Sequence, residues 1–399
     1  MVLTFPLSFP NFNLYSTPLL VLVLQGLIFS FLLFGKYIKT KDISYAILGL
    51  ILLITCYHRT TYTIGFMDWY DTYRNTKINY YLINLGFIVV PLVYLYVRSI
   101  TSSDFKLKRK HLWHFLPGII YIVIKLVILV YDANQPGFKE TQNGYLVQNF
   151  QWKYVDPFQS VLSYIQIIIY LVLSLQLYFN YRRNIQQYFS NMYQLELNWM
   201  RGFLFVYAAL FLYDIGQTMV NLTITELSWT QKWWLHFFNA LAIIYIGVKG
   251  YFTNTDRLKG LEFDGNTTIG SVAFTAENSE NEIVLPAEVK DLAEKIEQYF
   301  QIEKPHLDPD LNLISLSKTL KANRADISEA INSGLGKNFN DYVNHYRVQE
   351  VKKMLLEGKQ QQLSLLGIAL ECGFNSKATF NRVFKKMTGQ SPSQFVSTL

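Results

Sequence analysis

The first 252 residues consist of long apolar runs separated by short polar segments. A helix needs about 20 apolar residues to cross the hydrocarbon core of a bilayer, which is about 30 Å thick. Seven runs of that length occur, although the second reaches it only by including His58 and Arg59. The pattern predicts a membrane domain over residues 1–252 with seven spans, or eight if the boundaries are misplaced. The seven runs are Ser16–Gly35, Ile43–Ile64, Asn79–Val97, Leu112–Tyr131, Phe158–Tyr181, Phe203–Ile224 and Trp233–Phe252.

Basic residues are distributed unevenly between the loops that join these runs. The loops on one side of the membrane carry 14 Lys and Arg, and those on the other side carry 6. Lys and Arg in short loops favour the cytoplasmic side. This places the N-terminus outside and everything after residue 252 in the cytoplasm. The tryptophans agree, because all seven lie at or near span ends, where interfacial aromatic residues gather.

The pattern changes after the last apolar run. Residues 253–285 are rich in Asn, Thr, Glu and Gly and show no apolar period, which predicts an acidic flexible linker. Beyond Pro286, apolar residues such as Val289, Leu292 and Ile296 recur every three or four positions and predict an amphipathic helix. Its apolar face either packs on the domain that follows or forms a dimer contact.

Short helical periods separated by turns fill the rest of the chain. Apolar positions predict a helix, a short turn and a second helix over about residues 313–332, which is a helix-turn-helix unit. A longer helix follows and ends at Gly358, and the pattern then repeats over about residues 364–387. The predicted fold class is all-α: a polytopic membrane helix bundle of about seven spans, followed by a cytoplasmic double helix-turn-helix domain over residues 286–399.

Composition and charge support this division. Only 16% of the residues are charged, whereas soluble proteins average about 25%, so an ordinary cytosolic enzyme is not expected. Net charge is +9 over residues 1–252, −7 over 253–309 and +5 over 310–399. The sequence holds no P-loop, Gly-rich nucleotide motif, HExxH or Cys/His metal spacing, so we expect no enzyme activity, cofactor or metal. Cys56 and Cys372 lie in different domains and are not expected to form a disulfide.

Four polar side chains fall within predicted spans, where charge is costly and calls for a partner or a function. They are Arg59, Lys125, Asp214 and His236. Counting along each helix places Asp214 near mid-bilayer and the others nearer the outer surface, so all four can line one outward-facing cavity. Such a cavity would be a ligand, ion or coupling site. The alternatives are a buried Lys125–Asp214 pair that fixes helix packing, or side chains that snorkel to the surface.

The polar face of the second helix in each unit carries the chemistry for reading DNA. In the major groove Arg and Lys suit guanine, Asn suits adenine and Glu accepts from cytosine N4, while basic side chains also neutralise phosphates. The expected DNA-binding residues are Arg324, Ser328 and Glu329, which should face outward from the first unit, with Lys377, Ala378, Asn381, Arg382, Lys385 and Lys386 in the second. We assign Arg382 and Lys377 to guanine, and Lys385 and Lys386 to phosphates. The alternative for each of these side chains is a solvated surface.

The helix between the two units sets their spacing. At about 18 residues it is about 27 Å long. This length can hold two recognition helices near the spacing of about 34 Å between successive major grooves. One protomer would then read two grooves.

Both units carry residues in a recognisable pattern. They are Ile368–Ser376 (IALECGFNS), Phe380–Lys386 (FNRVFKK), Gly389 and Ser391–Phe395 in the second unit, and Ile327, Ser328, Asn332, Phe339–Asn344 and Tyr346–Val348 in the first. This pattern resembles that of a known family, the AraC/XylS-type transcription regulators. It covers about 90 residues and implies a DNA-binding domain of two helix-turn-helix units joined by a long helix. Two positions depart from the family pattern: Ser317 stands where the family usually has a small alanine, and Gly367 stands where it usually has an acidic residue. Both positions affect packing or the surface of the domain.

These observations predict a membrane-anchored, sequence-specific DNA-binding transcription regulator of the bacterial inner (cytoplasmic) membrane. The apolar block is similar in layout to that of membrane-embedded regulators that carry such a domain after a multi-span sensor. Expected partners are double-stranded DNA, membrane lipid and RNA polymerase, with a homodimer and a small-molecule or peptide signal as further options. Two alternatives stay open: a transporter or channel with an autoregulatory DNA-binding tail, and a scaffold whose helix-turn-helix fold binds protein.

Overall fold

The computed structural model describes residues 10–73, 81–102, 105–141, 143–190, 197–253 and 286–399. Within them the regular structure is helical and contains no strand, which confirms the predicted all-α fold class. The chain divides into two compact units, Met1–Tyr178 with Asn198–Glu262, and Phe179–Leu197 with Phe263–Leu399. The boundary falls inside the helix α7 (Asp156–Tyr188), so the end of α7 belongs to the C-terminal unit. Apart from Thr253, the predicted linker lies outside the described residues.

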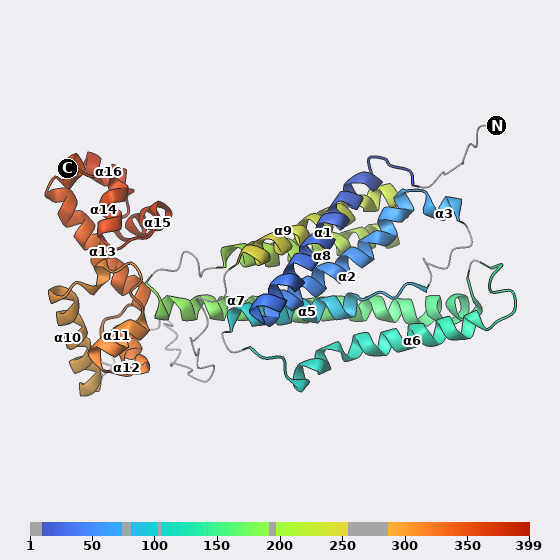
Figure 1. The fold of residues 1–399 in the computed structure, drawn as a ribbon, viewed down its shortest axis with the longest axis horizontal. Coiled ribbons are helices and arrows are strands. Elements are labelled where there is room, and N and C mark those ends of the chain that lie inside the picture. Colours follow the sequence, from blue (N-terminus) through green and yellow to red (C-terminus); the bar gives the residue numbers. More distant parts are fainter. Residues whose placement is uncertain (1–9, 74–80, 103–104, 142, 191–196, 254–285) are drawn as a thin grey trace. The chain divides into compact units, whose positions relative to one another are not determined.

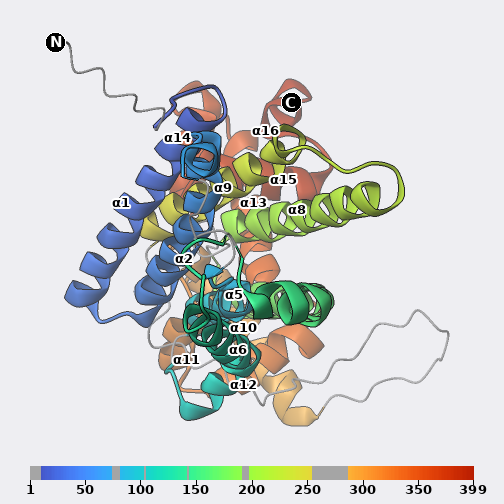
Figure 2. The same ribbon diagram turned by 90° about the vertical axis from the view of Figure 1, so that its right-hand side faces the viewer.

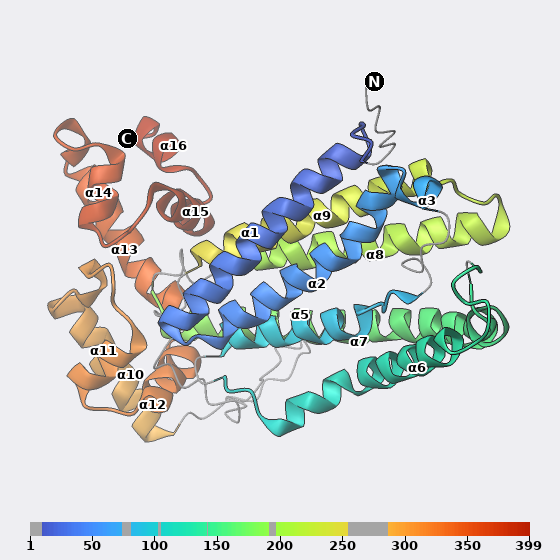
Figure 3. The same ribbon diagram turned by 45° about the vertical axis from the view of Figure 1, so that its right-hand side comes forward.

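The N-terminal unit is a bundle of long apolar helices. They are α1 (Ser16–Thr40), α2 (Ile43–Phe66), the short α3 (Trp69–Thr72), α5 (Gly86–Thr101), α6 (Leu116–Ala133), α7, α8 (Asn198–Thr223) and α9 (Trp229–Phe252). The views in Figure 1, Figure 2 and Figure 3 agree that α1, α2, α8 and α9 lie together on one side of the bundle, and α5, α6 and α7 on the other. Among the described residues, six helical segments are long and apolar enough to cross a membrane: Ser16–Thr40, Ile43–Phe66, Arg109–Ala133, Val147–Tyr188, Asn198–Thr223 and Trp229–Phe252.

The expected span Asn79–Val97 is where the helices differ from the prediction. Its helix, α5, has 16 residues and is about 24 Å long, so six helices among the described residues reach membrane length rather than seven. Residues 82–85 are not helical. The backbone N–H of Leu85 donates to His58 Nε2 at 2.8 Å, and that of Gly86 donates to Asn84 Oδ1 at 2.8 Å. These bonds replace helical ones, so the helix begins only at Gly86.

A proline inside α5 connects this helix to α7. Pro91 has no N–H, so the carbonyl of Phe87, four residues earlier, receives no bond from it. The side chain of Gln166, buried on α7, donates to that carbonyl at 3.3 Å. This hydrogen bond joins α5 to α7, and without it the carbonyl of Phe87 would be a buried acceptor with no donor.

The C-terminal unit is built from short helices around two cores. After α10 (Ala287–Ile302) come α11 (Leu313–Leu320), α12 (Arg324–Glu329), α13 (Phe339–Leu356), α14 (Leu365–Glu371), α15 (Lys377–Thr388) and α16 (Pro392–Ser397). One core gathers apolar side chains of α10, α11, α12 and the start of α13, and the other gathers those of α14, α15 and the rest of α13. The long helix α13 therefore joins two helix-turn-helix units, as expected.

The amphipathic helix α10 packs on the domain that follows it. Ala293, Ile296 and Phe300 are at most 5% exposed and belong to the same core as Leu313 and Ile327. Of the two alternatives for its apolar face, the structure therefore shows packing within the chain. The first helix-turn-helix unit carries an additional helix as part of its fold.

Local capping explains why the two units turn where they do. Asn323 caps α12, and Ser364 and Ser376 cap α14 and α15 by accepting from backbone N–H groups. Lys321 and Gly373 provide the left-handed residues in the two turns. Gly373 also lies against backbone, since a Cβ there would be 2.4 Å from the carbonyl oxygen of His306.

We predict that Gly373→Ala destabilises the second unit strongly. The change adds left-handed strain of about 1–2 kcal/mol to an overlap with backbone that costs about 1–3 kcal/mol more. The measurement is amide hydrogen exchange of α14 and α15 in the full-length protein. Gly336→Ala is the matched control, because Gly336 has φ +64° and nothing within 4 Å of its Cβ position. Equal effects of the two changes would contradict the close approach at Gly373.

Candidate functional site

The exposed face of α15 is set by the side chains that this helix buries. Phe380, Val383 and Phe384 are at most 5% exposed and pack with Ile368 and Phe374 in the second core. The opposite face is therefore turned to solvent. All six side chains predicted to contact DNA from this helix are exposed: Lys377, Ala378, Asn381, Arg382, Lys385 and Lys386.

Lys386 forms an ion pair that joins α15 to α13. Its Nζ lies 2.8 Å from Asp341 Oδ1 and 3.0 Å from Oδ2. The pair is largely exposed, so its contribution to stability is small. A phosphate would have to compete with Asp341 for this ammonium group.

The first unit presents its predicted residues unevenly. Glu329 is exposed and Arg324 is partly buried, but Ser328 is 4% exposed and its Oγ accepts from Asn332 Nδ2 at 3.2 Å. The expectation that Ser328 faces outward is wrong. It lies three residues from Ile331, which the first core buries completely, so the helical period turns its hydroxyl toward that core.

Buried polar side chains of α13 hold the end of α7. Asn340 Nδ2 donates to the carbonyl of Phe189 at 3.0 Å and to that of Ser190 at 2.8 Å. Arg347 Nη2 donates to Ser190 Oγ at 3.2 Å, and Ser190 Oγ donates to the carbonyl of Leu311 at 2.5 Å. Residues 189 and 190 are thus bonded to both α13 and the start of α11, within the first helix-turn-helix unit.

Arg347 is also bonded to the segment between α10 and α11. Its Nε donates to the carbonyl of His306 and its Nη2 to that of Asp308, each at 2.8 Å. Arg347 is 1% exposed, and this burial lowers the pKa of its guanidinium to about 10. The side chain remains charged at neutral pH. Sequence reasoning included Arg347 in the family resemblance but gave no signal that Ser190 would be its partner.

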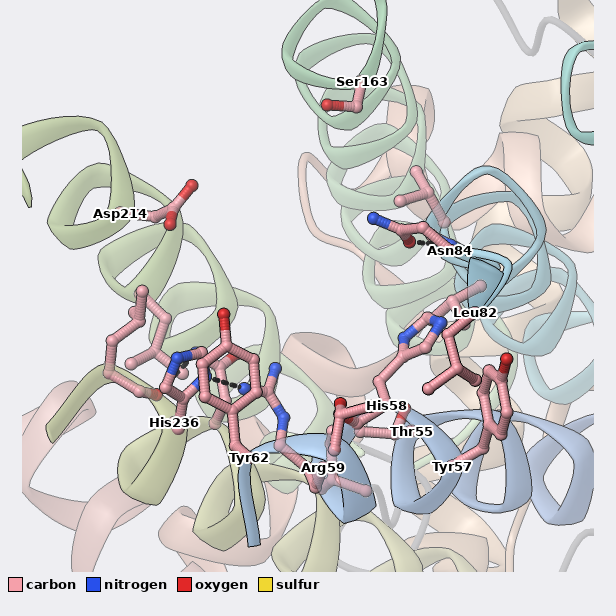
Figure 4. A pocket seen from close by; sticks show the side chains of 18 of the residues that line it. Thr55, Tyr57, His58, Arg59, Tyr62, Leu82, Asn84, Ser163, Asp214 and His236 are labelled. Atoms are coloured by element: carbon pink, nitrogen blue, oxygen red, sulfur yellow. Dashed lines mark hydrogen bonds between the residues drawn. The ribbon is translucent and has the colours of Figure 1, made fainter. Parts of the chain in front are cut away.

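The N-terminal unit contains a cavity of about 540 Å³. Three of the four polar residues predicted within spans line it: Arg59 from α2, Asp214 from α8 and His236 from α9 (Figure 4). Arg59 Nη1 contacts His236 Nδ1. Sequence reasoning missed His58 and Asn84, which also line the cavity.

The fourth predicted residue, Lys125, lies elsewhere in the unit. It is 3% exposed, and its Nζ donates to Gln151 Oε1 at 2.7 Å. Gln151 Nε2 in turn donates to Asp156 Oδ2 at 3.3 Å. The structure therefore places Lys125 with Gln151 and Asp156 and not with Asp214.

Comparison with known proteins identifies the C-terminal part of the chain. Residues 316–398 match the model of a helix-turn-helix domain, of the AraC type. An uncharacterised HTH-type transcriptional regulator of Staphylococcus aureus strain COL is 30% identical over 102 residues, which are 26% of this chain and 13% of that protein. A probable transcription factor, PqrA, of Proteus vulgaris is 44% identical over 55 residues, 14% of this chain and 43% of that protein. No solved structure matches.

These matches confirm the predicted helix-turn-helix domain and cover little else. The chain spans less than half the length of these two relatives. Both relatives are described as transcriptional regulators or transcription factors, which agrees with DNA binding by this domain. The matched residues include the exposed face of α15.

We predict that Arg382→Ala lowers DNA affinity by about 1–3 kcal/mol and relaxes base preference at one position, because a base-reading arginine is lost. Lys385→Ala is the comparison, and it should weaken all sequences alike by removing a phosphate contact. Electrophoretic mobility of selected and random duplexes measures both effects. For about 5 phosphate contacts, log K should fall against log salt with a slope of about −4.5. If the wild-type protein and Arg382→Ala both show the same affinity for selected and for random duplexes, Arg382 does not read bases.

Proposed function

We propose that the protein is a membrane-anchored, sequence-specific DNA-binding transcription regulator that couples a membrane or external signal to gene expression. The observation that carries the proposal is the combination, in one chain, of six membrane-length helices with an AraC-type helix-turn-helix domain. The exposed basic and amide side chains of α15 are the groups that would read the operator. Double-stranded DNA, membrane lipid and RNA polymerase are the proposed partners, and a homodimer is compatible with this function.

The cytoplasmic location of the DNA-binding domain requires an odd number of crossings from an external N-terminus. Six helices in the described part of the chain have membrane length, and we propose that α5 makes the seventh crossing together with residues 82–85. About 24 Å of helix and about 13 Å of extended chain exceed the bilayer core of about 30 Å. Non-helical backbone is tolerated at membrane depth where it lines a cavity. Leu82, Ile83 and Asn84 line the cavity of the N-terminal unit.

The helix α7 is the proposed route of coupling. One continuous helix begins in the N-terminal unit and ends in the C-terminal unit, where Tyr188 packs against the first core. Residues 189 and 190 then form the hydrogen bonds to Asn340 and Arg347. A signal that favours one arrangement of α7 over another would therefore act on the first DNA-binding unit, provided that it binds the two arrangements with different affinity.

We predict that reporter fusions distinguish seven crossings from six. Fusions after Tyr73, Gly144 and Glu226 should report the exterior, and fusions after Lys41, Lys110, Arg183 and Lys259 the cytoplasm. The pair Tyr73 and Lys110 tests α5 directly, because the two positions flank it. An external signal at Lys259 would separate the DNA-binding domain from DNA and overturn the function.

A second prediction concerns the end of α7. Full-length protein and residues 286–399 expressed alone should differ in DNA affinity by about fivefold or more, the usual lower range of a coupling free energy. Asn340→Asp keeps the acceptor for Asn344 but turns a carboxylate toward the carbonyls of Phe189 and Ser190. It should bring the full-length protein to the affinity of the fragment.

The same substitution in the fragment is the control, and it should leave DNA affinity unchanged because residues 189 and 190 are absent there. Fluorescence anisotropy with a labelled operator measures all four proteins. Should Asn340→Asp leave the difference between full-length protein and fragment intact, the end of α7 does not couple the two units.

A further inference from the structure

We propose that the cavity of the N-terminal unit binds a small zwitterion, a molecule with one carboxylate and one ammonium group, such as a free amino acid or a short peptide. The inference rests on the proposed regulatory function, because it names the signal that this function requires.

The cavity is large enough for such a ligand and is built from many elements. Its volume of about 540 Å³ falls in the range of about 300–1,000 Å³ that is typical of small-molecule sites. Side chains of α2, α3, α5, α7, α8 and α9 line it, together with the non-helical residues 82–84. A ligand here would contact most of the helices in the unit, and its binding would affect how they pack.

Both histidines in the cavity wall act as hydrogen-bond acceptors through one nitrogen. His58 Nε2 accepts from the backbone N–H of Leu85, and His236 Nδ1 accepts from Arg59 Nη1. A ring nitrogen that accepts carries no proton, so each imidazole is neutral. Among the residues that line the cavity, Arg59 and Asp214 are then the charged side chains.

Arg59 and Asp214 are not paired with each other. No ion pair joins them among the described residues, and Figure 4 shows the Asp214 carboxylate directed into the cavity, apart from the guanidinium. Arg59 Nε is buried and has no hydrogen-bond partner within the described part of the chain. The Asp214 carboxylate has the hydroxyl of Tyr164 on α7 as a hydrogen-bond partner and interacts electrostatically with Arg59, but within the described residues no ion pair neutralises either charge, and an unneutralised charge at membrane depth is costly.

A zwitterion would satisfy both charges at once. Its carboxylate would accept from Arg59, whose planar guanidinium suits that group. Its ammonium would donate to Asp214 and lie near aromatic rings, which attract cations; Tyr62, Tyr207, Phe211 and Trp229 all line the cavity. A simple anion would be repelled by Asp214, and a simple cation by Arg59. The same rings and apolar side chains such as Leu210 and Ile243 would hold the rest of the molecule.

The test uses the full-length protein in lipid nanodiscs and measures its thermal unfolding. The probes are each standard amino acid, the matching glycyl dipeptides, and the amine and carboxylate analogues that lack one of the two charged groups. We expect at least one amino acid or dipeptide to raise the unfolding temperature, and to bind about tenfold or more tightly than either singly charged analogue. The amino acid and dipeptide series separate the two sources of the zwitterion.

Variants assign each charge to its side chain. In Arg59→Gln the zwitterion should bind no more tightly than the amine analogue, because the partner of its carboxylate is lost. In Asp214→Asn the zwitterion should bind no more tightly than the carboxylate analogue, because the partner of its ammonium group is lost. Arg59→Lys keeps the charge and should retain part of the binding, which guards against a folding defect in Arg59→Gln. Asp156→Asn is the matched control for Asp214→Asn, since Asp156 is bonded to Gln151 and does not line the cavity.

Several results would overturn the assignment. It is wrong if no amino acid or dipeptide shifts the unfolding temperature, if a singly charged analogue binds as well as the zwitterion, or if Asp156→Asn weakens binding as much as Asp214→Asn. DNA binding by the same preparations separates this failure from failure of the proposed function. Loss of ligand binding with normal DNA binding refutes only the cavity's ligand, whereas ligand binding without sequence-specific DNA binding refutes the regulatory function.

Discussion

A buried guanidinium fixes the arrangement of the C-terminal unit. Arg347 is 1% exposed and donates to the carbonyls of His306 and Asp308 and to Ser190 Oγ. An unsatisfied buried charge costs far more than a typical hydrogen bond gains, so the segment between α10 and α11, which carries two of these acceptors, must be in place whenever the unit is folded. Gly373 allows this packing, because a Cβ there would lie 3.0 Å from Arg347 Nε and closer still to the His306 carbonyl. The segment that leads into the first unit, the turn of the second and the residues that follow α7 thus all contact one side chain.

The same rule of satisfied polar groups explains the N-terminal unit. Pro91 leaves a carbonyl that Gln166 satisfies, and the N–H of Leu85, outside any helix, donates to His58. Both contacts lie where α5 meets its neighbours, and the second holds residues 82–84 in the wall of the cavity. The proposed sensing function needs a cavity that a ligand can enter, and the contact of His58 with Leu85 lies at the wall of such a cavity.

Sequence reasoning succeeded where structure is determined locally. Helix α10 and the exposed face of α15 follow from periodicity within a few residues. It failed where a partner comes from far along the chain. The start of α5 depends on His58, the position of Lys125 depends on Gln151, and the role of Arg347 depends on Ser190, 157 residues away. Ser328 was wrongly predicted to face outward because α12 is only six residues long. So short a helix has too few apolar positions to show that the core also covers the side on which Ser328 lies.

The proposed function requires one chain both to span the membrane and to bind specific DNA sites. Chromatin capture with the tagged full-length protein, restricted to the membrane fraction of crosslinked cells, measures both properties in one experiment. A small set of discrete loci that share a sequence motif should be enriched in that fraction. Uniform recovery of the genome, or discrete loci recovered only from the soluble fraction, would contradict it.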